Sequence, residues 1–262
     1  MWGYILKRRI DINCDLGESY GAFKVGNDEK IMPHITSANI ACGFHAGDPV
    51  IMAQTINLAK KHKVAVGAHP SYPDILGFGR REMQLTLEEV KNYTIYQVSA
   101  LQGFARTAGI SLQHLKPHGA LYNRAVKDEK LSEALMDAVK ALSHDFIIFA
   151  PWKSALAKAA IEDGLHVAYE VFADRAYNPD GSLVSREQPN AIIQEPLKVM
   201  ERAIRMVKER TVLAVNGKVV DLGEVHTICV HGDTPVAVEL AKTLKKGLMK
   251  AGVDVKPVGS FV

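Results

Sequence analysis

Four histidines, a lysine and several carboxylates lie where we expect the strands of a buried parallel sheet to end. Each follows a short run of small or apolar residues, and a glycine or proline interrupts the chain nearby. The carboxyl ends of parallel strands meet on one face of an α/β fold, so side chains far apart in the sequence come together there. The residues at these expected strand ends are Asp15, Glu18, His45, Asp48, His69, Lys116, His118, Asp174, Arg175, His231 and Asp233.

Imidazoles and carboxylates gathered in this way suit two kinds of chemistry. They transfer protons as general acids and bases near neutral pH, or they hold a divalent metal ion between carboxylate and imidazole ligands. We therefore predict a catalytic site on this face and leave open whether it binds a metal. The predicted catalytic residues are Asp15, His45, His69, Lys116, His118, Asp174 and His231.

Two of the acidic residues also have a structural interpretation. Asp48 precedes Pro49 and is predicted to cap the following helix by accepting hydrogen bonds from backbone N–H groups. Asp233 lies just before Thr234-Pro235, where we expect the last helix to begin, and could cap that helix in the same way.

Three arginines are predicted to bind an anionic cofactor. Arg80 and Arg81 are adjacent in the long loop 71–83, where they could clamp an anion through bidentate hydrogen bonds or remain solvated. Arg175 follows the sixth expected strand, next to Asp174.

Familiar nucleotide-binding and nucleophile motifs do not occur in the sequence. Gly217-Lys218 lacks the Ser or Thr that completes a phosphate-binding loop, and Gly77-Phe78-Gly79 is not continued as a dinucleotide-binding motif. No G-x-S-x-G motif is present, and Cys14, Cys42 and Cys229 lie inside expected strands. A serine or cysteine nucleophile is therefore not indicated.

The elements that position these side chains alternate between strand and helix. The clearest example is 38–49, with a buried strand, a loop that presents His45 between Gly43 and Gly47, and a helix that begins at Pro49. Further strands are expected at 9–16, 64–68, 146–150, 167–172 and 227–230, and the segment 114–119 is expected to contain another strand and its exit.

About seven such alternations without a linker predict an α/β protein. We expect a single-domain parallel (β/α) barrel of seven or eight units over residues 1–262, with an open doubly wound sheet as the alternative. Asn216-Gly217, between two apolar runs, predicts a β-hairpin insertion near 211–222.

The composition is that of an ordinary soluble protein. Of the 262 residues, 47% are hydrophobic and 23% are charged, and the formal net charge of +3 favours neither nucleic acid nor a membrane surface as a partner. No run approaches the roughly 18 apolar residues that span a bilayer, and Met1–Arg9 does not resemble a secretory signal. Three cysteines in apolar strands predict free, buried thiols and a cytoplasmic location.

The residues around the expected strand ends also form long and specific motifs. These motifs resemble those of the LamB/YcsF family over nearly the whole chain. They are 13–18 (NCDLGE), 39–48 (NIACGFHAGD), 67–74 (GAHPSYPD), 77–81 (GFGRR), 116–123 (KPHGALYN), 170–175 (EVFADR) and 231–233 (HGD).

The resemblance implies both a function and a fold. The family is that of the A subunit of prokaryotic 5-oxoprolinase, which implies ATP-dependent opening of 5-oxo-L-proline to L-glutamate together with partner subunits B and C. Its fold is a barrel similar to that of glycoside hydrolases and polysaccharide deacetylases. Because the deacetylases use an Asp/His/His metal site, the resemblance makes Asp15, His45 and His69 candidate ligands of a divalent metal.

The chemistry of a five-membered lactam fits this implied activity. Its amide is stabilised, and phosphorylation of the carbonyl oxygen by ATP would make the carbon electrophilic enough for water to attack. The candidate roles are the base on water for Asp15 or His45, the acid for the departing group for His118 or His231, and binding of the substrate carboxylate or phosphate for Lys116 and Arg175.

Two other classes of function stay open. The chain could be a metal-dependent, deacetylase-like hydrolase that acts alone, or a non-catalytic component that binds substrate while its partners carry out the chemistry. Metal analysis and chelator sensitivity test the first class, and turnover with and without ATP and partners tests the second.

Overall fold

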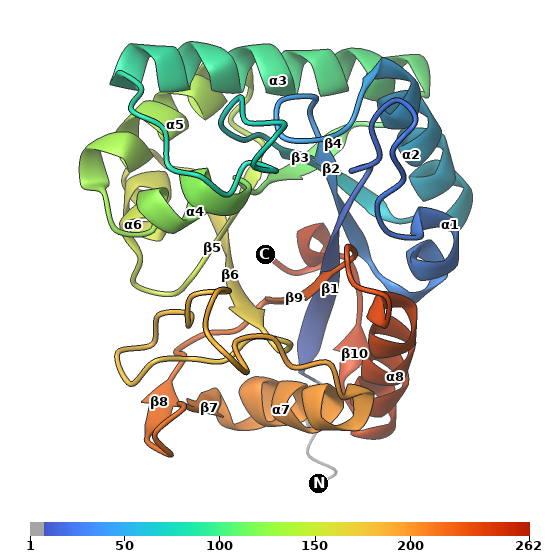
Figure 1. Ribbon diagram of the computed structural model, residues 1–262, viewed down its shortest axis with the longest axis vertical. Helices are drawn as coiled ribbons and strands as arrows, with labels where there is room; N and C mark the ends of the chain where they lie inside the picture. The colour runs from blue at the N-terminus through green and yellow to red at the C-terminus, as the bar shows by residue number, and fades with distance from the viewer. Residues whose placement is uncertain (1–7) are drawn as a thin grey trace, which may run out of the picture.

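The computed structural model describes residues 8–262, so most of the segment Met1–Arg9, which was compared with a secretory signal, lies outside the described residues. Within the described part, strands and helices alternate, and the helices form a ring around a parallel sheet (Figure 1). The strands of this sheet that alternate with helices are β1 (Arg9–Leu16), β2 (Ser37–Ala41), β3 (Ala65–His69), β4 (Leu112–Leu115), β5 (Ile147–Ala150), β6 (His166–Phe172) and β9 (Thr227–His231).

The sheet closes on itself. Its strands follow the order β1-β2-β3-β4-β5-β6-β9, each parallel to the next, and β9 pairs with both β6 and β1. A short additional strand, β10 (Asp254–Val255), pairs with the first two residues of β1. Seven strands therefore form a closed parallel barrel. This confirms the predicted (β/α) barrel and excludes the open doubly wound sheet.

Several helices begin at a residue whose side chain caps them. Asp48 accepts hydrogen bonds from the backbone N–H groups of Val50 and Ile51, as predicted, and Thr86 and Glu89 form a capping box. None of the helices within residues 8–262 combines the length and the apolar character needed to cross a membrane. The helices are α1 (Asp28–Ile31), α2 (Pro49–His62), α3 (Leu87–Thr107), α4 (Gly119–Ala125), α5 (Glu129–Leu142), α6 (Ala155–Glu162), α7 (Pro196–Glu209) and α8 (Ala237–Lys250), with short 3-10 helices η1 (Met32–His34) and η2 (Val258–Ser260).

The last helix starts later than predicted. The prediction placed its start at Thr234-Pro235, with Asp233 as a candidate cap. In the structure α8 begins at Ala237, and Val236 in the capping position makes no side-chain hydrogen bond. Asp233 Oδ2 instead lies 2.6 Å from Arg80 Nη2. An arginine from a distant loop therefore binds the carboxylate that the local sequence assigns to a helix cap.

A separate two-stranded sheet lies between α7 and β9 in the chain. β7 (Thr211–Leu213) and β8 (Val219–Asp221) pair in antiparallel register. The turn between them contains Gly217, whose φ of 82° is in the left-handed region that glycine adopts without strain.

The interior of the barrel is polar. Asp11, Asn13 and Asp15 alternate along β1 with apolar residues that belong to the hydrophobic core. Asn13 donates hydrogen bonds to Glu170 on β6 and Thr227 on β9. The hydrophobic core therefore lies between the strands and the helices, while a hydrogen-bonded column replaces the branched apolar layers that usually fill such barrels. All three cysteines are buried and free, as predicted.

The C-terminal segment covers the amino end of β5 and β6. In Figure 1 the C-terminus lies within the ring of strands. One opening of the barrel is thus covered by apolar side chains, and the polar column leads toward the opposite, carboxyl end. The residues in this contact are Val258, Phe261 and Val262 from the C-terminal segment with Ile147, Phe149 and Ala168 from the strands.

Candidate active site

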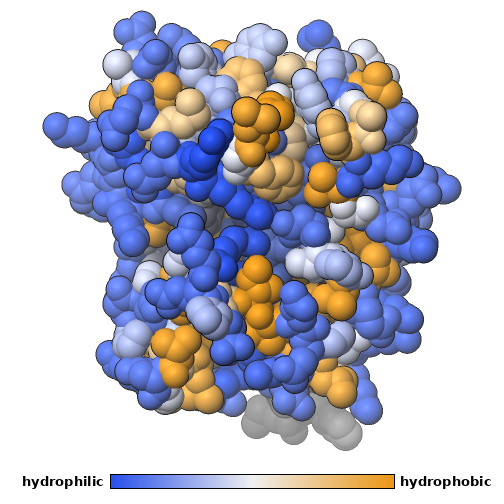
Figure 2. All heavy atoms as spheres, in the orientation of Figure 1, coloured by the Kyte–Doolittle hydropathy of each residue, from blue (hydrophilic) through white to orange (hydrophobic). Residues whose placement is uncertain are grey.

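The carboxyl ends of the strands bring together the side chains that the sequence analysis selected. All seven predicted catalytic side chains are buried, with exposed fractions between 1% and 8%. In the orientation of Figure 1, the space-filling view shows a hollow near the middle of the molecule, bordered mainly by hydrophilic residues (Figure 2). The seven side chains belong to three neighbouring groups, which centre on Lys116, His118 and His231.

The first, which we call the lysine group, consists of Lys116, Asn13, Asp15, Glu170 and Cys229. Lys116 Nζ lies 2.8 Å from Glu170 Oε1 and 3.2 Å from Asp15 Oδ1. It also lies 3.0 Å from Cys229 Sγ and 3.3 Å from Asn13 Oδ1. An ammonium has three N–H donors, so these four acceptors occupy its hydrogen-bonding capacity.

The lysine group is an ion network. Burial alone would lower the pKa of Lys116, but the negative charges around it, those of Asp15 and Glu170 among them, hold the pKa well above its usual value. Burial alone would raise the pKa of Asp15, but His69 and Lys116 hold that pKa well below its usual value. Burial raises the pKa of the Cys229 thiol. The group is therefore an ammonium between carboxylates, with a neutral thiol beside it.

Further side chains hold the lysine group in place. Tyr122 on α4 donates its hydroxyl hydrogen to Glu170 Oε2 at 2.7 Å. Asn39 on β2 donates to Asp15 Oδ1 at 2.7 Å, and the Nε2 atom of His114 lies 2.8 Å from Asn39 Oδ1. Burial lowers the pKa of His114 to about 3, so this ring is neutral and donates one N–H. The carboxylates of the group thus have fixed positions.

The second group, the histidine group, consists of Glu18, His45, His69 and His118. One nitrogen or oxygen atom from each residue lies within 4.8 Å of those of the other three. His118 Nδ1 is 2.9 Å from His69 Nε2 and 3.7 Å from Glu18 Oε1. His45 Nε2 is 3.3 Å from Glu18 Oε1, and its ring stacks on that of His118 with centroids 3.8 Å apart.

Burial decides the charges in the histidine group. It lowers the pKa of His45 and of His118 well below the usual value, so these rings are neutral near pH 7. Burial and the nearby carboxylates of Asp15 and Asp233 raise the pKa of Glu18 well above its usual value. Three imidazoles and a carboxyl group with this arrangement are a donor set that could bind a metal ion.

A glycine allows a loop to approach the histidine group closely. Gly79, in the loop between β3 and α3, has a φ of 65°, which side chains rarely adopt. A Cβ atom on it would lie 2.3 Å from Ser71 Oγ and 2.7 Å from His45 Cβ. The same loop places the Phe78 carbonyl oxygen 2.9 Å from His118 Nε2. The backbone of the segment 77–81 therefore holds the imidazole ring of His118 in place.

The third group is the pair of Asp174 and His231. Asp174 Oδ2 lies 2.8 Å from His231 Nδ1 and accepts a second hydrogen bond, at 3.2 Å, from the His231 backbone N–H. Burial would raise the pKa of Asp174, but these contacts with His231 lower it. The carboxylate therefore orients the ring with Nδ1 as the donor, and Nε2 is the nitrogen left to accept or donate a proton. This is the arrangement of a general acid–base histidine.

The three predicted anion-binding arginines contact neither the lysine group nor the histidine group directly. Arg80 pairs with Asp233, and Arg81 pairs with Asp74. Arg175 directs its guanidinium at backbone carbonyl oxygens, 2.6 Å from that of Val184 and 3.4 Å from that of Ala191. Burial lowers the pKa of Arg175 to about 10. In this structure Arg175 orders the loop after β6.

The sequence analysis did not select several residues of these groups. Glu170 lies in the middle of β6 and Tyr122 lies on α4, so neither is at a strand end. Asn13 and Asn39 lie inside strands, where Asn13 accepts from Lys116 and Asn39 donates to Asp15. The available signal was polarity inside otherwise apolar strands, because a polar residue that faces a closed barrel needs a buried partner.

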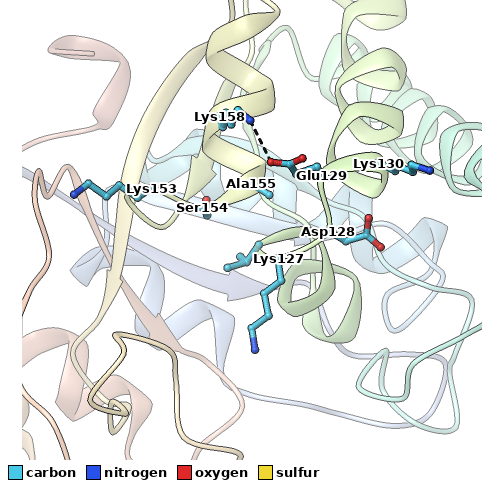
Figure 3. Close-up of a pocket in the computed structure, with 9 residues that line it drawn as sticks. Lys127, Asp128, Glu129, Lys130, Lys153, Ser154, Ala155 and Lys158 are labelled. Carbon is cyan, nitrogen blue, oxygen red and sulfur yellow. Dashed lines mark hydrogen bonds and ion pairs between the residues drawn. The ribbon is translucent and has the colours of Figure 1, made fainter.

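A surface pocket lies away from these three groups. It has a volume of about 690 Å³ at the starts of α5 and α6, and four lysines border it (Figure 3). Asp128 and Ser154 already accept hydrogen bonds from the first backbone N–H groups of those helices. Lys158 pairs with Glu129, and both side chains are more than half exposed. The pocket contains none of the predicted site residues, and we do not assign the chemistry to it.

The chain is similar to curated relatives and to solved structures over almost its whole length. A curated relative from Pyrococcus horikoshii, which is named as the A subunit of 5-oxoprolinase, is 53% identical over 254 residues, which are 97% of this chain and 99% of the relative. A solved lactam utilization protein from Thermus thermophilus superposes with a TM-score of 0.89 at 43% identity, over 95% of this chain and 99% of that one.

A more distant solved structure shows likeness of fold alone. The catalytic domain of a peptidoglycan N-acetylglucosamine deacetylase from Eubacterium rectale superposes with a TM-score of 0.50 at 9% identity, over 96% of this chain and 88% of that one. This agrees with the barrel that the sequence motifs implied.

The sequence profile of the LamB/YcsF family matches residues 10–262. The match includes all seven strands of the barrel except the first residue of β1, and all three groups at their carboxyl ends. The chain belongs to the LamB/YcsF family.

Proposed function

We propose that this chain is the A subunit of a cytoplasmic 5-oxoprolinase, which opens 5-oxo-L-proline to L-glutamate with ATP in a complex with subunits B and C. The name of the relative that is 53% identical over almost the whole length supports the activity. The oriented His231–Asp174 pair beside buried carboxylates supports a site for hydrolysis in this chain. Three free thiols support a reducing compartment.

The His231–Asp174 pair is the observation that carries the proposed chemistry. Hydrolysis of an activated lactam needs a base to take a proton from water and an acid to give one to the ring nitrogen. His231 has a fixed tautomer and is the most exposed of the seven predicted catalytic residues, at 8%. We assign it this proton transfer, with Asp174 as its positioning residue.

The lysine group has an electrostatic role in this proposal. Lys116 has its N–H donors directed at four acceptors within the protein, so we assign it to holding Asp15 and Glu170 rather than to binding the substrate carboxylate directly. Asp15 is held as a carboxylate next to the site and can stabilise positive charge that develops on an imidazole.

The nucleotide is assigned mainly to one of the partner proteins. This chain has no phosphate-binding loop, and the guanidinium of Arg175 is directed at backbone carbonyl oxygens. Arg80 and Arg81 remain the chain's own candidates for a phosphate contact. Arg80 is the better placed of the two, because its contact with Asp233 links the loops that follow β3 and β9, whereas Arg81 pairs with Asp74 within its own loop.

A metal-dependent hydrolase that acts alone is a second candidate, which the histidine group favours. Glu18, His45, His69 and His118 would hold the ion. A bound divalent ion would polarise a carbonyl group and lower the pKa of a water molecule.

The test is turnover of 5-oxoproline by the chain alone, with ATP, and with ATP and both partner subunits. We expect product only in the complete mixture, and a His231→Gln variant to reduce the rate by about 10²–10⁴-fold. His226→Gln, outside the three groups, is the matched control and should keep its activity. Turnover by the isolated chain without ATP would contradict the proposal and support the second candidate.

A further inference from the structure

His69 and His118 meet in a way that two neutral imidazoles cannot satisfy. The Nδ1 atom of His69 lies 2.6 Å from the backbone carbonyl oxygen of Lys116, and the Nε2 atom of His118 lies 2.9 Å from that of Phe78. A carbonyl oxygen only accepts hydrogen bonds, so each of these nitrogens carries its ring's hydrogen. The other two nitrogens, which face each other at 2.9 Å, therefore both present lone pairs.

Two lone pairs at this distance repel unless a positive charge lies between or beside them. Either a shared proton or a metal ion supplies that charge. The carbonyl contacts are the outer-shell hydrogen bonds that metal-binding histidines make, because they fix the tautomer and direct the free nitrogen at the ion. Both histidines have such a contact, and in both it comes from the backbone.

Two more donors lie around the same point. Glu18 Oε1 is 3.3 Å from His45 Nε2 and 3.7 Å from His118 Nδ1. An ion with tetrahedral bonds of about 2.0–2.1 Å separates neighbouring donor atoms by roughly 3.3 Å. Three of the six donor–donor distances within the histidine group are 2.9, 3.3 and 3.7 Å, the others are no longer than 4.8 Å, and all four side chains are buried.

We propose that Glu18, His45, His69 and His118 form a binding site for one divalent first-row transition-metal ion of the zinc type. Three imidazole nitrogens and one carboxylate oxygen suit Zn²⁺, Co²⁺ or Ni²⁺, whereas Mg²⁺ and Ca²⁺ prefer oxygen ligands. This site differs from the Asp15, His45 and His69 set that the resemblance to deacetylases implies. It includes Glu18 and His118. Asp15 Oδ1 lies 3.4 Å from His69 Nε2 but is already paired with Lys116 Nζ at 3.2 Å, so we leave it out of the ligand set.

The neighbouring cluster of Asp15, Cys229 and His231 is the control within the same molecule. Its donor atoms are also within 4.8 Å of one another. There, however, the Lys116 ammonium lies 3.2 Å from Asp15 and 3.0 Å from Cys229, so the protein supplies the cation itself. Among residues 8–262, Glu18 makes no ion pair with a lysine or an arginine.

The site can be tested by metal binding to the isolated chain, without any measurement of turnover, so the outcome does not depend on the proposed function. Protein stripped with a chelator is titrated with Zn²⁺ and, separately, with Mg²⁺, and the bound metal and the melting temperature are measured. We expect one Zn²⁺ per chain and a higher melting temperature with Zn²⁺, and neither effect with Mg²⁺ at the same concentration.

Variants then locate the ion. His118→Asn should weaken Zn²⁺ binding by at least the roughly 10–100-fold that loss of an outer-shell partner costs. Glu18→Gln leaves all three imidazoles in place and should weaken binding by about tenfold or more, which keeps the test decisive if His118→Asn does not fold. His231→Gln, the matched control in the neighbouring cluster, should bind Zn²⁺ within about twofold of the unmodified chain.

Two results would overturn the proposal. The first is the absence of stoichiometric Zn²⁺ binding to the stripped chain, which would assign the contact between His69 and His118 to a shared proton. The second is Zn²⁺ binding that survives Glu18→Gln unchanged but is lost in His231→Gln, which would place the ion in the other cluster.

Discussion

The lysine group and the histidine group lie at the same end of the barrel, and both are buried, yet their polar atoms are satisfied differently. Lys116 lies between Asp15 and Glu170, and each charge in that group has an opposite charge next to it. In the histidine group the His69 and His118 nitrogens that face each other have no N–H between them while both rings are neutral, and Asp15 Oδ1, which is itself an acceptor, lies 3.4 Å from His69 Nε2. Buried polar atoms without partners are costly. The comparison teaches that the chain completes one group with its own cation and leaves the other to be completed from outside.

Removal of the internal cation should have the largest effect on stability. Lys116→Met leaves two carboxylates buried without their partner, and we expect the free energy of unfolding to fall by about 3–5 kcal/mol. Urea denaturation of the isolated chain measures this. The exposed Lys130→Met should change the free energy by less than about 0.5 kcal/mol. A similarly small change for Lys116→Met would remove the distinction between the two groups.

Asp11, the first residue of the polar column along β1, should titrate with pH. Burial raises the pKa of Asp11 from its usual 3.8 to about 6. The folded state holds the proton of Asp11 more tightly than the unfolded state does. The stability that this protonation contributes is therefore fully present below about pH 4 and is lost as the pH rises through about 6. Two pKa units correspond to about 3 kcal/mol. The difference in unfolding free energy between unmodified chain and Asp11→Asn should change by about this amount between pH 4 and pH 7.

Two observations check that interpretation. Asp145→Asn, at an exposed position, should follow the unmodified chain at every pH. If the unfolding free energy of Asp11→Asn also changes with pH as that of the unmodified chain does, then Asp11 does not titrate in this range. The polar column would then not carry the buried proton that we assign to it.

Loss of one supporting hydrogen bond should have a smaller effect. Tyr122→Phe removes the donor that lies 2.7 Å from Glu170 Oε2, in the group that the protein itself satisfies. Hydrogen bonds to charged groups contribute about 1.5–3 kcal/mol, and we expect a loss of stability in that range. Thermal or urea unfolding measures it, and Tyr96→Phe on the surface of α3 is the control. A loss near zero would indicate that water readily replaces the hydroxyl.

The ion pair near the histidine group should contribute least. Arg80 acts on Glu18 from a distance, but its side chain is 37% exposed and pairs with Asp233. A double-mutant cycle with Arg80→Ala and Asp233→Asn should give a coupling energy of about 0.2–1 kcal/mol that decreases with salt. A coupling energy above about 2 kcal/mol would mean that the pair is shielded from solvent, so that Arg80 is a fixed cation near the histidine group.

Local rules were enough to predict much of the fold. Strand–loop–helix alternation predicted the barrel, and Asp48 with Pro49 predicted the start of α2. The rule failed for α8, where Asp233 pairs with Arg80 across 153 positions of sequence instead of capping the helix. A helix cap depends on neighbouring residues, whereas an ion pair between loops depends on how the barrel closes.

The amino-acid sequence by itself determined which residue types reach the carboxyl ends of the strands. A run of apolar residues marks a buried strand and the glycines after it mark its end, and both are visible within a short stretch of sequence. Only the tertiary structure decided which atoms of those residues are free. The Lys116 and Phe78 carbonyls select the tautomers of His69 and His118, and the closure of β9 onto β1 places Cys229 against Lys116. Hydrogen-bond partners far apart in the chain are chosen by the register of a closed sheet, which no local pattern specifies.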